Sequence, residues 1–322
     1  MKKLLVIVVL VVIAGGIYWR QIEKNPKIVL DKTDWHPYAI KKMMDKVNPE
    51  GRITIEKELT GQAGFSSYIV SYLSENLKQY SLMHVPRGTK PEDGWPVIIV
   101  NHGYINPKEF STIDSYKNTS AYYANKGFLV LKPDYRGHDK SEGTPTQLIA
   151  RNEYTVDVLN LVEAVKSIPD ANADFIFLYG HSLGGDVALQ VAEVSQKIKG
   201  VSLWAPAVTY YPLSLTYFGK SHNANANYNV MEAEELTMKY GNQLSALDNI
   251  NMIKTPIIIQ HSVTDESVPF DWGKQLNDAL VRNGKKSNLY SYAKDNHNIA
   301  GHWAEALNRD VEFFRGLISG LN

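Results

Sequence analysis

The sequence of 322 residues contains no cysteine. This absence excludes disulfide bonds, zinc–thiolate sites, a cysteine nucleophile and lipid attachment through cysteine, but it leaves the cellular compartment open. The sequence also lacks an excess of charge, because 34 basic residues balance 34 acidic ones. With no basic stripe, we expect no nucleic-acid partner. The remaining composition is that of an ordinary globular protein, without an evident internal repeat or low-complexity tract.

One long apolar run stands near the N-terminus, at residues 4–19, directly after Lys2 and Lys3. It is longer than most signal-peptide cores and slightly short for a transmembrane helix. Residues 12–14 fit a cleavage site, yet the run continues to Tyr18 and Trp19, which suit a membrane interface. We therefore favour an uncleaved signal anchor in residues 1–20 over a cleaved signal peptide.

Basic residues flank this apolar run on both sides, so the positive-inside rule leaves its orientation open. For so short an N-terminal tail, the expected arrangement is a single anchor in the cell membrane with the rest of the chain outside the cytoplasm. The alternative is secretion after cleavage. Residues 21–50 are polar, carry three prolines and predict a linker with a short helix over 38–47.

Residues 51–322 predict one α/β domain. The first part reads as strands over 53–59, 68–73 and 79–85, the last two forming a hairpin. Short apolar runs then alternate with helical patterns, which is typical of parallel strands buried on both faces. The predicted strands are 97–100, 128–131, 175–179, 201–204, 257–259 and 289–293, and the predicted helices are 119–126, 149–168, 185–194, 272–282 and 303–318. This order predicts a mostly parallel central sheet with helices on both faces.

Residues 207–248 interrupt the alternation. This stretch is too long for a simple loop in a compact domain, and insertions of this length are often lids. It predicts one short helix, near 231–240, and carries several aromatic residues. Those aromatics either line an acyl pocket or pack the insertion onto the sheet, and the sequence favours neither.

The motif G-x-S-x-G is present as Gly180-His181-Ser182-Leu183-Gly184, between the strand at 175–179 and the helix at 185–194. A strand that turns sharply into a helix holds such a serine in a strained conformation with its hydroxyl exposed. The flanking glycines avoid collisions with the neighbouring elements, and the helix N-terminus favours a developing anion. We predict that Ser182 is a nucleophile.

A serine nucleophile requires a base and an acid that orients the base, in the chain order Ser, acid, His for this kind of fold. Asp265 follows the strand at 257–259, and His297 follows the last strand, so both lie at the sheet edge where ligands bind. The rival base is His302, which reads as the start of the final helix. The rival acid is Glu266, and Asp271 suits a helix cap better than Asp265 does.

The oxyanion of the reaction requires two N–H donors. Leu183 supplies one by its position after Ser182, and Tyr104, in the turn after the strand at 97–100, supplies the other. His102 and His181 are interpreted as structural. We interpret Asp134 as a turn residue, with Arg136 as its ion-pair partner. No metal or other cofactor is expected, since His297 and His302 lack the spacing of a zinc-binding helix.

These motifs resemble those of α/β-hydrolases, and more closely the prolyl-oligopeptidase-like and dienelactone-hydrolase-like branch. The segments that carry the resemblance span residues 50–320 and are 101–104, 133–138, 180–185, 264–269 and 295–298. The resemblance implies a triad of Ser182, Asp265 and His297 with an oxyanion hole from Tyr104 and Leu183. The sequence departs from the family at Asp139, where a small residue is usual, and it has no room for a β-propeller.

The combined expectation is a serine hydrolase that cleaves esters or other acyl bonds through an acyl-enzyme intermediate. Its activity is expected to fall below about pH 6 to 7 as His297 becomes protonated. The alternative within the same class is a serine peptidase of prolyl-oligopeptidase type that acts on short peptides. The alternative from another class is a non-catalytic envelope binding protein of the same fold. The sequence leaves the bond that is cleaved and the oligomeric state open.

Overall fold

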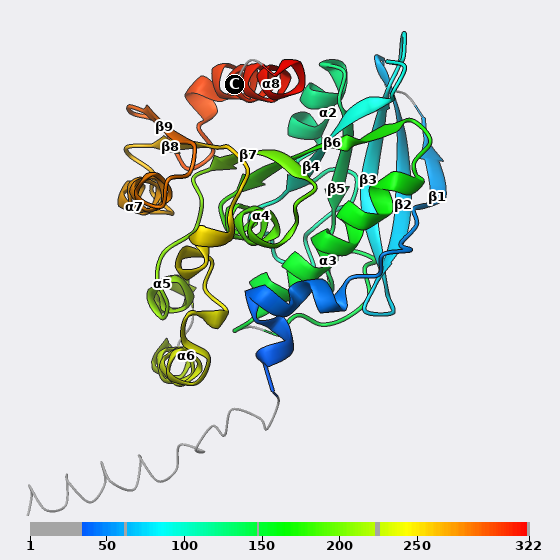
Figure 1. The fold of residues 1–322 in the computed structure, drawn as a ribbon. Coiled ribbons are helices and arrows are strands. Elements are labelled where there is room, and N and C mark those ends of the chain that lie inside the picture. The colour runs from blue at the N-terminus through cyan, green and yellow to red at the C-terminus, as the bar shows by residue number, and fades with distance from the viewer. Residues whose placement is uncertain (1–33, 61–62, 147, 223–225, 321–322) are drawn as a thin grey trace, which may run out of the picture. The chain divides into compact units, whose positions relative to one another are not determined.

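A central sheet organises the chain (Figure 1). The computed structural model describes residues 34–60, 63–146, 148–222 and 226–320, and within these ranges the sheet has nine strands. Their order is β1-β2-β3-β5-β4-β6-β7-β8-β9. Strand β5 therefore lies between β3 and β4, and the other strands follow one another in chain order. The unit from Trp35 to Asn322 is compact in itself.

The sheet is antiparallel at one end and parallel through the rest. The antiparallel strands are β1 (Thr54–Leu59), β2 (Phe65–Ser74) and β3 (Leu77–Pro86), and β3 also pairs antiparallel with β5. The parallel strands are β4 (Trp95–Asn101), β5 (Leu129–Pro133), β6 (Ala171–His181), β7 (Ile198–Trp204), β8 (Ile257–Ser262) and β9 (Ser287–Tyr292). All six parallel strands therefore end at the same edge of the sheet.

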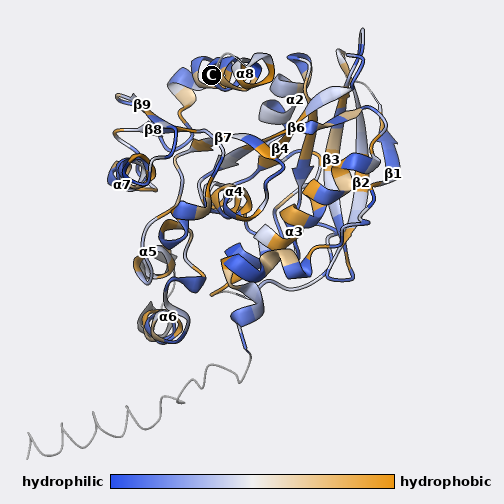
Figure 2. Ribbon diagram, in the orientation of Figure 1, coloured by the Kyte–Doolittle hydropathy of each residue, from blue (hydrophilic) through white to orange (hydrophobic). Residues whose placement is uncertain are grey.

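Helices cover both faces of the sheet (Figure 1). One layer holds α2 (Lys117–Asn125) and α8 (Trp303–Ser319), with Phe128 and Phe314 in a shared core. The other holds α3 (Ala150–Ala164), α4 (Leu183–Val194) and α7 (Phe270–Arg282), whose apolar side chains share a second core with the opposite face of the sheet. Figure 2 shows hydrophobic residues along the strands and on the helices. The predicted α/β fold with helices on both faces is confirmed.

The insertion contains more helix than the sequence predicts. It forms α5 (Leu213–His222) and α6 (Ala226–Tyr240), where we expected one short helix near 231–240. The sequence pattern does not indicate where α6 begins, because residues 223–229 are rich in asparagine, a poor helix former. Leu236 and Tyr240 bury against Ile149, so packing on the main domain stabilises α6 beyond its local propensity.

Residues 35–50, expected to hold part of a linker and a short helix, pack as part of the compact unit. Two 3₁₀ helices form here, η1 (His36–Tyr38) and η2 (Ile40–Lys46), and the side chains of Ile40 and Met43 are fully buried. The predicted anchor in residues 1–20 lies outside the described residues and stays a prediction. Among the residues that are described, no helix is long and apolar enough to span a membrane.

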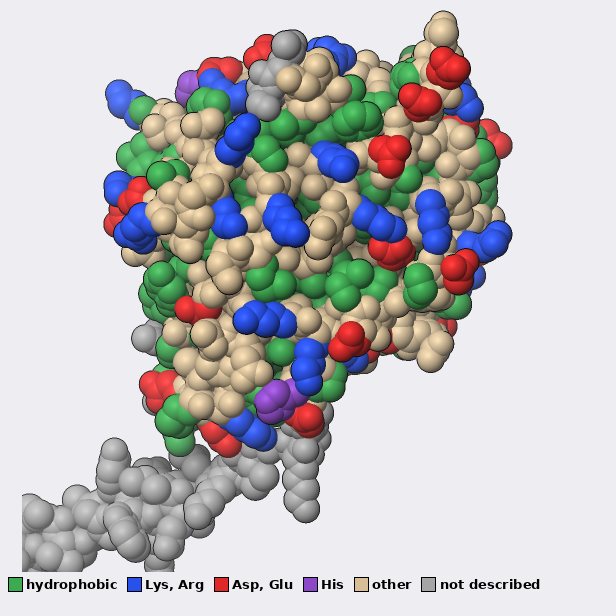
Figure 3. All heavy atoms as spheres, in the orientation of Figure 1, with side chains coloured by type: hydrophobic (Ala, Val, Ile, Leu, Met, Phe, Trp, Pro, Cys, Tyr) green, Lys and Arg blue, Asp and Glu red, His purple; other side chains and the backbone are tan. Residues whose placement is uncertain are grey.

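The molecular face drawn in Figure 3 carries Lys and Arg side chains interspersed with Asp and Glu. Side chains of both signs thus occur on this face, in keeping with the balanced composition.

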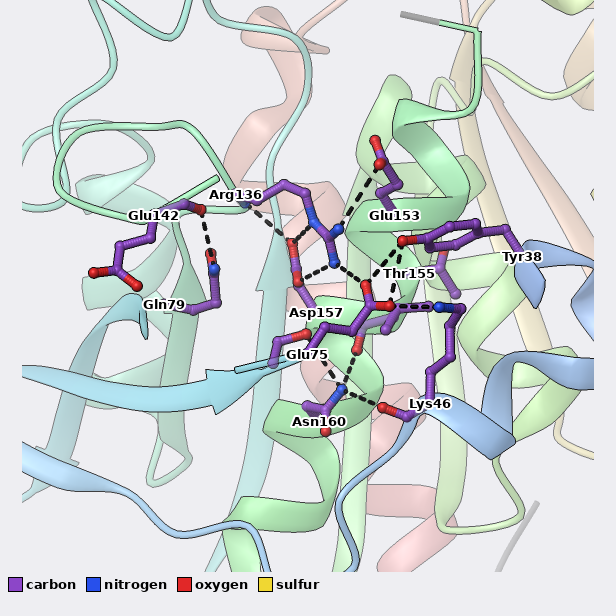
Figure 4. Close-up of polar contacts among 12 residues, drawn as sticks. Tyr38, Lys46, Glu75, Gln79, Arg136, Glu142, Glu153, Thr155, Asp157 and Asn160 are labelled. Atoms are coloured by element: carbon purple, nitrogen blue, oxygen red, sulfur yellow. Dashed lines mark hydrogen bonds and ion pairs between the residues drawn. The ribbon is translucent and has the colours of Figure 1, made fainter. Parts of the chain in front are cut away.

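A buried ionic cluster ties the N-terminal segment to the sheet (Figure 4). Arg136 has a side chain only 4% exposed, and it donates to Asp157 at 2.7 and 3.0 Å and to Glu75 at 2.9 Å. Glu75 also accepts from Tyr38 and Lys46 of the N-terminal segment. The predicted pair between Arg136 and Asp134 is therefore wrong.

Asp134 has other partners than the one we predicted. Its carboxylate accepts a hydrogen bond from the hydroxyl of Thr112 and lies near the buried ammonium of Lys132. Although Arg136 is only two residues away in sequence, its guanidinium points to α3, where Asp157 is fully buried. The prediction from sequence spacing was wrong because Arg136 binds Asp157, a partner 21 residues away.

We expect Arg136→Ala to lower the free energy of unfolding by about 3–5 kcal/mol, because it leaves the buried carboxylate of Asp157 without its counter-ion. Urea unfolding followed by circular dichroism measures this loss. The control is Lys90→Ala, which removes a surface pair with Asp170 whose two side chains are nearly half exposed. That control should cost less than about 1 kcal/mol. Equal losses in the two variants would contradict the prediction.

Candidate functional site

Ser182 stands in the sharp turn between β6 and α4. Its backbone has φ 56° and ψ −119°, a left-handed conformation that a non-glycine residue rarely adopts. Three backbone hydrogen bonds hold it there: Ser182 N donates to Trp204 O at 2.9 Å, and Ser182 O accepts from Gly185 N and Ala207 N, each at 2.9 Å. The surrounding strands therefore enforce the strained turn that the motif predicts.

The glycines of the motif are required by close backbone contacts. A Cβ atom on Gly184 would lie 2.2 Å from the carbonyl oxygen of Asn101, and one on Gly180 would lie 2.5 Å from the carbonyl oxygen of Gly184. No side chain fits at these distances. The first turn of α4 therefore packs directly on the chain that leaves β4.

Asp265 and His297 meet at the same edge of the sheet, after β8 and β9. The Nδ1 atom of His297 lies 2.8 Å from Oδ2 of Asp265. The other carboxylate oxygen, Oδ1, accepts from the backbone N–H groups of Ser267 and Val268 at 2.8 and 2.9 Å. Sequence reasoning predicted these two side chains, and the structure brings them into hydrogen-bond contact.

A fourth donor to Asp265 is a residue that the sequence analysis missed. The Nε2 atom of His261, in β8, lies 3.0 Å from Oδ2 of Asp265. Burial by itself would raise the pKa of Asp265, but hydrogen bonds from His261 and His297 hold that pKa well below the usual value of a carboxyl. Asp265 is therefore ionised across the neutral range. The position of His261 at a strand end, four residues before Asp265, was the signal available in the sequence.

Ser182 and His297 line one cavity of about 870 Å³. Glu266 and the aromatic residues Tyr104, Tyr217 and Phe218 share its wall. Tyr217 and Phe218 belong to α5, and their rings also contact Trp272 of α7, with centroids 4.9 and 6.1 Å apart. The aromatics of the insertion thus line the cavity and also pack the insertion onto the domain.

The two residues predicted to supply N–H donors lie near Ser182: Leu183 follows it in the chain, and Tyr104 lines the same cavity. Leu183 is the first residue of α4, where backbone N–H groups have no acceptor within the helix. Tyr104 is a 72% exposed residue on the cavity wall, in the loop after β4. The preceding N–H, that of Gly103, is already bound to the hydroxyl of Tyr116 at 2.9 Å.

Tyr116 and His181 connect the loops around the cavity, and the sequence analysis missed this connection. The hydroxyl of Tyr116 lies 2.5 Å from Nδ1 of His181, and Nε2 of His181 lies 3.1 Å from the carbonyl oxygen of His297. This chain of hydrogen bonds joins the loop after β4, the turn at Ser182 and the loop after β9. His181 therefore has structural contacts on both ring nitrogens, and Tyr116 carried no motif that would have indicated its role.

The rival residues have other partners. His302 ends the 3₁₀ turn before α8 and is the N-cap of that helix; its side chain is 43% exposed and binds Asp295 through Nδ1 at 2.8 Å. Glu266 accepts a hydrogen bond from the backbone N–H of His297 at 3.0 Å, and the ring of His297 binds Asp265. Asp271 lies in the first turn of α7, whose N-cap is Pro269, so its predicted capping role is wrong.

The remaining predicted structural histidine, His102, is buried beneath the loop after β4. Its Nδ1 atom lies 2.7 Å from the carbonyl oxygen of Gly103, and its ring stacks on Tyr135 with centroids 4.2 Å apart. Burial lowers the pKa of His102 well below its ordinary value, so the ring is neutral. These contacts shape the loop that carries Tyr104.

The sheet order, the serine turn after a parallel strand and the histidine after the last strand define the class of α/β-hydrolases. The chain belongs to the prolyl oligopeptidase family, whose model matches residues 114–320.

Two curated relatives are similar over part of their length. Human protein ABHD12B is 26% identical over 199 residues, which cover 61% of this chain and 52% of that protein. Lysophosphatidylserine lipase ABHD12 of Xenopus tropicalis is 26% identical over 196 residues, which cover 56% of this chain and 46% of the relative. The chain thus spans about half the length of these two relatives.

Among solved structures, the acetyl xylan esterase from Paenibacillus sp. R4 is similar with a TM-score of 0.65 and 16% identity. The similarity covers 90% of this chain and 97% of that structure, and at this identity it concerns the fold alone. The family model and the sheet order thus agree on the class of α/β-hydrolases.

The buried His181 makes stability depend on pH. Burial, and then the nearby ring of His297, lower the pKa of His181 to about 3. In the unfolded chain the imidazole of His181 takes up a proton below about pH 6.5, whereas in the folded chain it stays neutral over this pH range. Stability should therefore fall as pH falls, and His181→Gln should reduce this slope by about 1.4 kcal/mol per pH unit between about pH 6 and pH 4.

Urea unfolding at a series of pH values measures this slope. The surface variant Lys90→Ala should keep the slope of the wild type. An unchanged slope in His181→Gln would show that the histidine takes up its proton in the folded state.

Proposed function

We propose that the protein hydrolyses carboxylic esters through Ser182, His297 and Asp265. The observation that carries this proposal is the contact between His297 and Asp265 at 2.8 Å, on the rim of the same cavity that Ser182 lines. A nucleophile, a base and an acid that orients the base are the parts that acyl transfer requires.

In the proposed reaction, the hydroxyl oxygen of Ser182 attacks the carbonyl carbon of the substrate, and Nε2 of His297 takes its proton. Asp265 binds the Nδ1–H of His297, which keeps Nε2 free as the base and stabilises the cation that forms. Four donors surround the carboxylate of Asp265, and this supports its ionised state during the transfer.

The negative charge that forms on the carbonyl oxygen is stabilised by the backbone N–H groups of Leu183 and Tyr104. The N-terminus of α4 adds its partial positive charge at the same point. His297 then returns the proton to the leaving alcohol, which departs and leaves an acyl group on Ser182. A water molecule, deprotonated by His297, attacks this acyl-enzyme and releases the acid.

The cavity wall supports an ester with an apolar acyl or aryl group. Tyr217 and Phe218 contribute apolar surface from α5, and Tyr104 adds a third aromatic ring. The relative from Xenopus tropicalis is named for the hydrolysis of an acyl ester of a lipid, which agrees with this choice. Family membership supports the second candidate, a peptidase that acts on short peptides.

The nucleophile and the base are tested by labelling with a fluorophosphonate, which reacts with activated serines. The wild type should be labelled, Ser182→Ala should not be labelled, and His297→Ala should be labelled at least about 10³-fold more slowly. His302→Ala is the matched control, because it removes a histidine five residues away that binds Asp295 instead. It should be labelled at the rate of the wild type.

Two results would reject the triad. One is a wild type that remains unlabelled, which would favour the non-catalytic binding protein. The other is equal labelling of Ser182→Ala, which would place the reactive serine elsewhere in the chain.

A substrate panel decides between ester and peptide. We expect p-nitrophenyl esters to be cleaved with kcat/KM at least about tenfold above that of aminoacyl and prolyl p-nitroanilides, with a preference among acyl chains that Phe218→Ala weakens through the loss of apolar contact. Ser182→Ala supplies the background rate for every substrate. A preference for the anilides would make the peptidase the better assignment.

A further inference from the structure

We propose that His261 is a positioning residue, which fixes the carboxylate of Asp265 so that its Oδ2 atom faces Nδ1 of His297. This inference rests on the proposed roles of Asp265 and His297. It adds a second histidine to the hydrogen-bond system of the site, one that touches neither the cavity nor the substrate.

The contacts of His261 define which of its nitrogens carries a proton. Nε2 lies 3.0 Å from Oδ2 of Asp265 and 3.1 Å from the carbonyl oxygen of Val268. Both oxygens are acceptors, so Nε2 must be the donor. His261 and His297 therefore donate to the same carboxylate oxygen from two directions.

The other ring nitrogen indicates that His261 is neutral. Its Nδ1 atom is buried and has no hydrogen-bond partner among the described residues. A charged ring would place an unpaired N–H there, which costs more free energy than an unpaired nitrogen of a neutral ring. A neutral donor orients Asp265 without cancelling its negative charge, so the full charge remains available to His297.

The packing around the ring leaves it no freedom. The side chain of His261 is fully buried, and the ring of Phe270 packs edge-on against it with centroids 5.6 Å apart. On α7, a Cβ atom on Gly273 would lie 2.4 Å from Nδ1 of His261. Glycine at 273 thus lets α7 approach closely enough to hold the ring against Asp265.

The geometry explains why a second donor is needed. Asp265 lies in a loop, and the donors to its Oδ1 atom among the described residues are the N–H groups of its own turn, those of Ser267 and Val268. His261 is the contact that joins Oδ2 to a strand of the central sheet. The ionisable groups around this pair are His297 from the loop after β9, His181 at the end of β6 and Glu266 from the same loop as Asp265.

The test compares His261→Leu, which removes the donor, with His261→Gln, whose amide nitrogen reaches about as far as Nε2. Rates are measured on a p-nitrophenyl ester and expressed per serine that a fluorophosphonate titrates. We expect His261→Leu to lower kcat about 10-fold to 100-fold with little change in KM, and His261→Gln to recover most of this loss.

The pH profile of kcat/KM separates positioning from a purely structural role. Without the donation from His261, the charge of Asp265 acts more strongly on His297, so the acidic limb should move to higher pH in His261→Leu and stay in place in His261→Gln. A purely structural role would lower the titrated fraction and the melting temperature while the profile of the remaining sites stayed unchanged.

Gly273→Ala is the second variant, and it keeps the test decisive where His261→Leu does not fold. Its new methyl group should displace the ring and lower kcat in the same way, and Lys274→Ala on the exposed side of α7 is its control. Wild-type kcat and pH profiles in both His261→Leu and Gly273→Ala, with a wild type that labels at Ser182, would overturn this inference alone. A wild type that fails to label would overturn the proposed function as well.

Discussion

The structure depends on a direct backbone contact between the start of α4 and the end of β4, which leaves no space for a side chain at Gly184. The first turn of α4 packs on the backbone that leaves β4, and a Cβ atom on Gly184 would come within 2.2 Å of Asn101 O. This approach brings the start of α4 next to the loop with Tyr104, which shares a cavity wall with Ser182. It also explains the left-handed backbone of Ser182, since the turn must close over so short a distance. Strain at one residue is offset by hydrogen bonds to β7 and the segment after it.

Two buried carboxylates, those of Asp157 and Asp265, are stabilised by several hydrogen-bond donors each, but the donors differ in charge. Asp157 lies in the interior of α3 and receives three hydrogen bonds from Arg136, a fixed cation. Asp265 receives four hydrogen bonds, two from backbone N–H groups and two from histidine rings. The first arrangement neutralises the charge of Asp157 with that of Arg136, which suits a purely structural contact. The second leaves the carboxylate charge uncancelled, and this suits the role that we propose for Asp265 as the partner of His297.

Much of the fold could be predicted because its signals are local. Continuous apolar runs marked the parallel strands, and the turn with two glycines marked Ser182. The side chains of Asp265 and His297 were found because both follow strands that end at the same edge. The predicted partner of Arg136 was wrong, and so was the predicted number of helices in the insertion. In both cases the deciding partner, Asp157 or Ile149, is far away in the sequence.

The sequence by itself determined the class of fold, the serine turn and the candidate acid and base, because strand periodicity, glycine and residue type are properties of short segments. Only the tertiary structure decided which histidine meets Asp265 and that His261 meets it too, because α7, β8 and the loop after β9 converge there from separate parts of the chain. It also decided that α5 lines the cavity with Tyr217 and Phe218. Contacts between distant segments depend on packing, which no local pattern encodes.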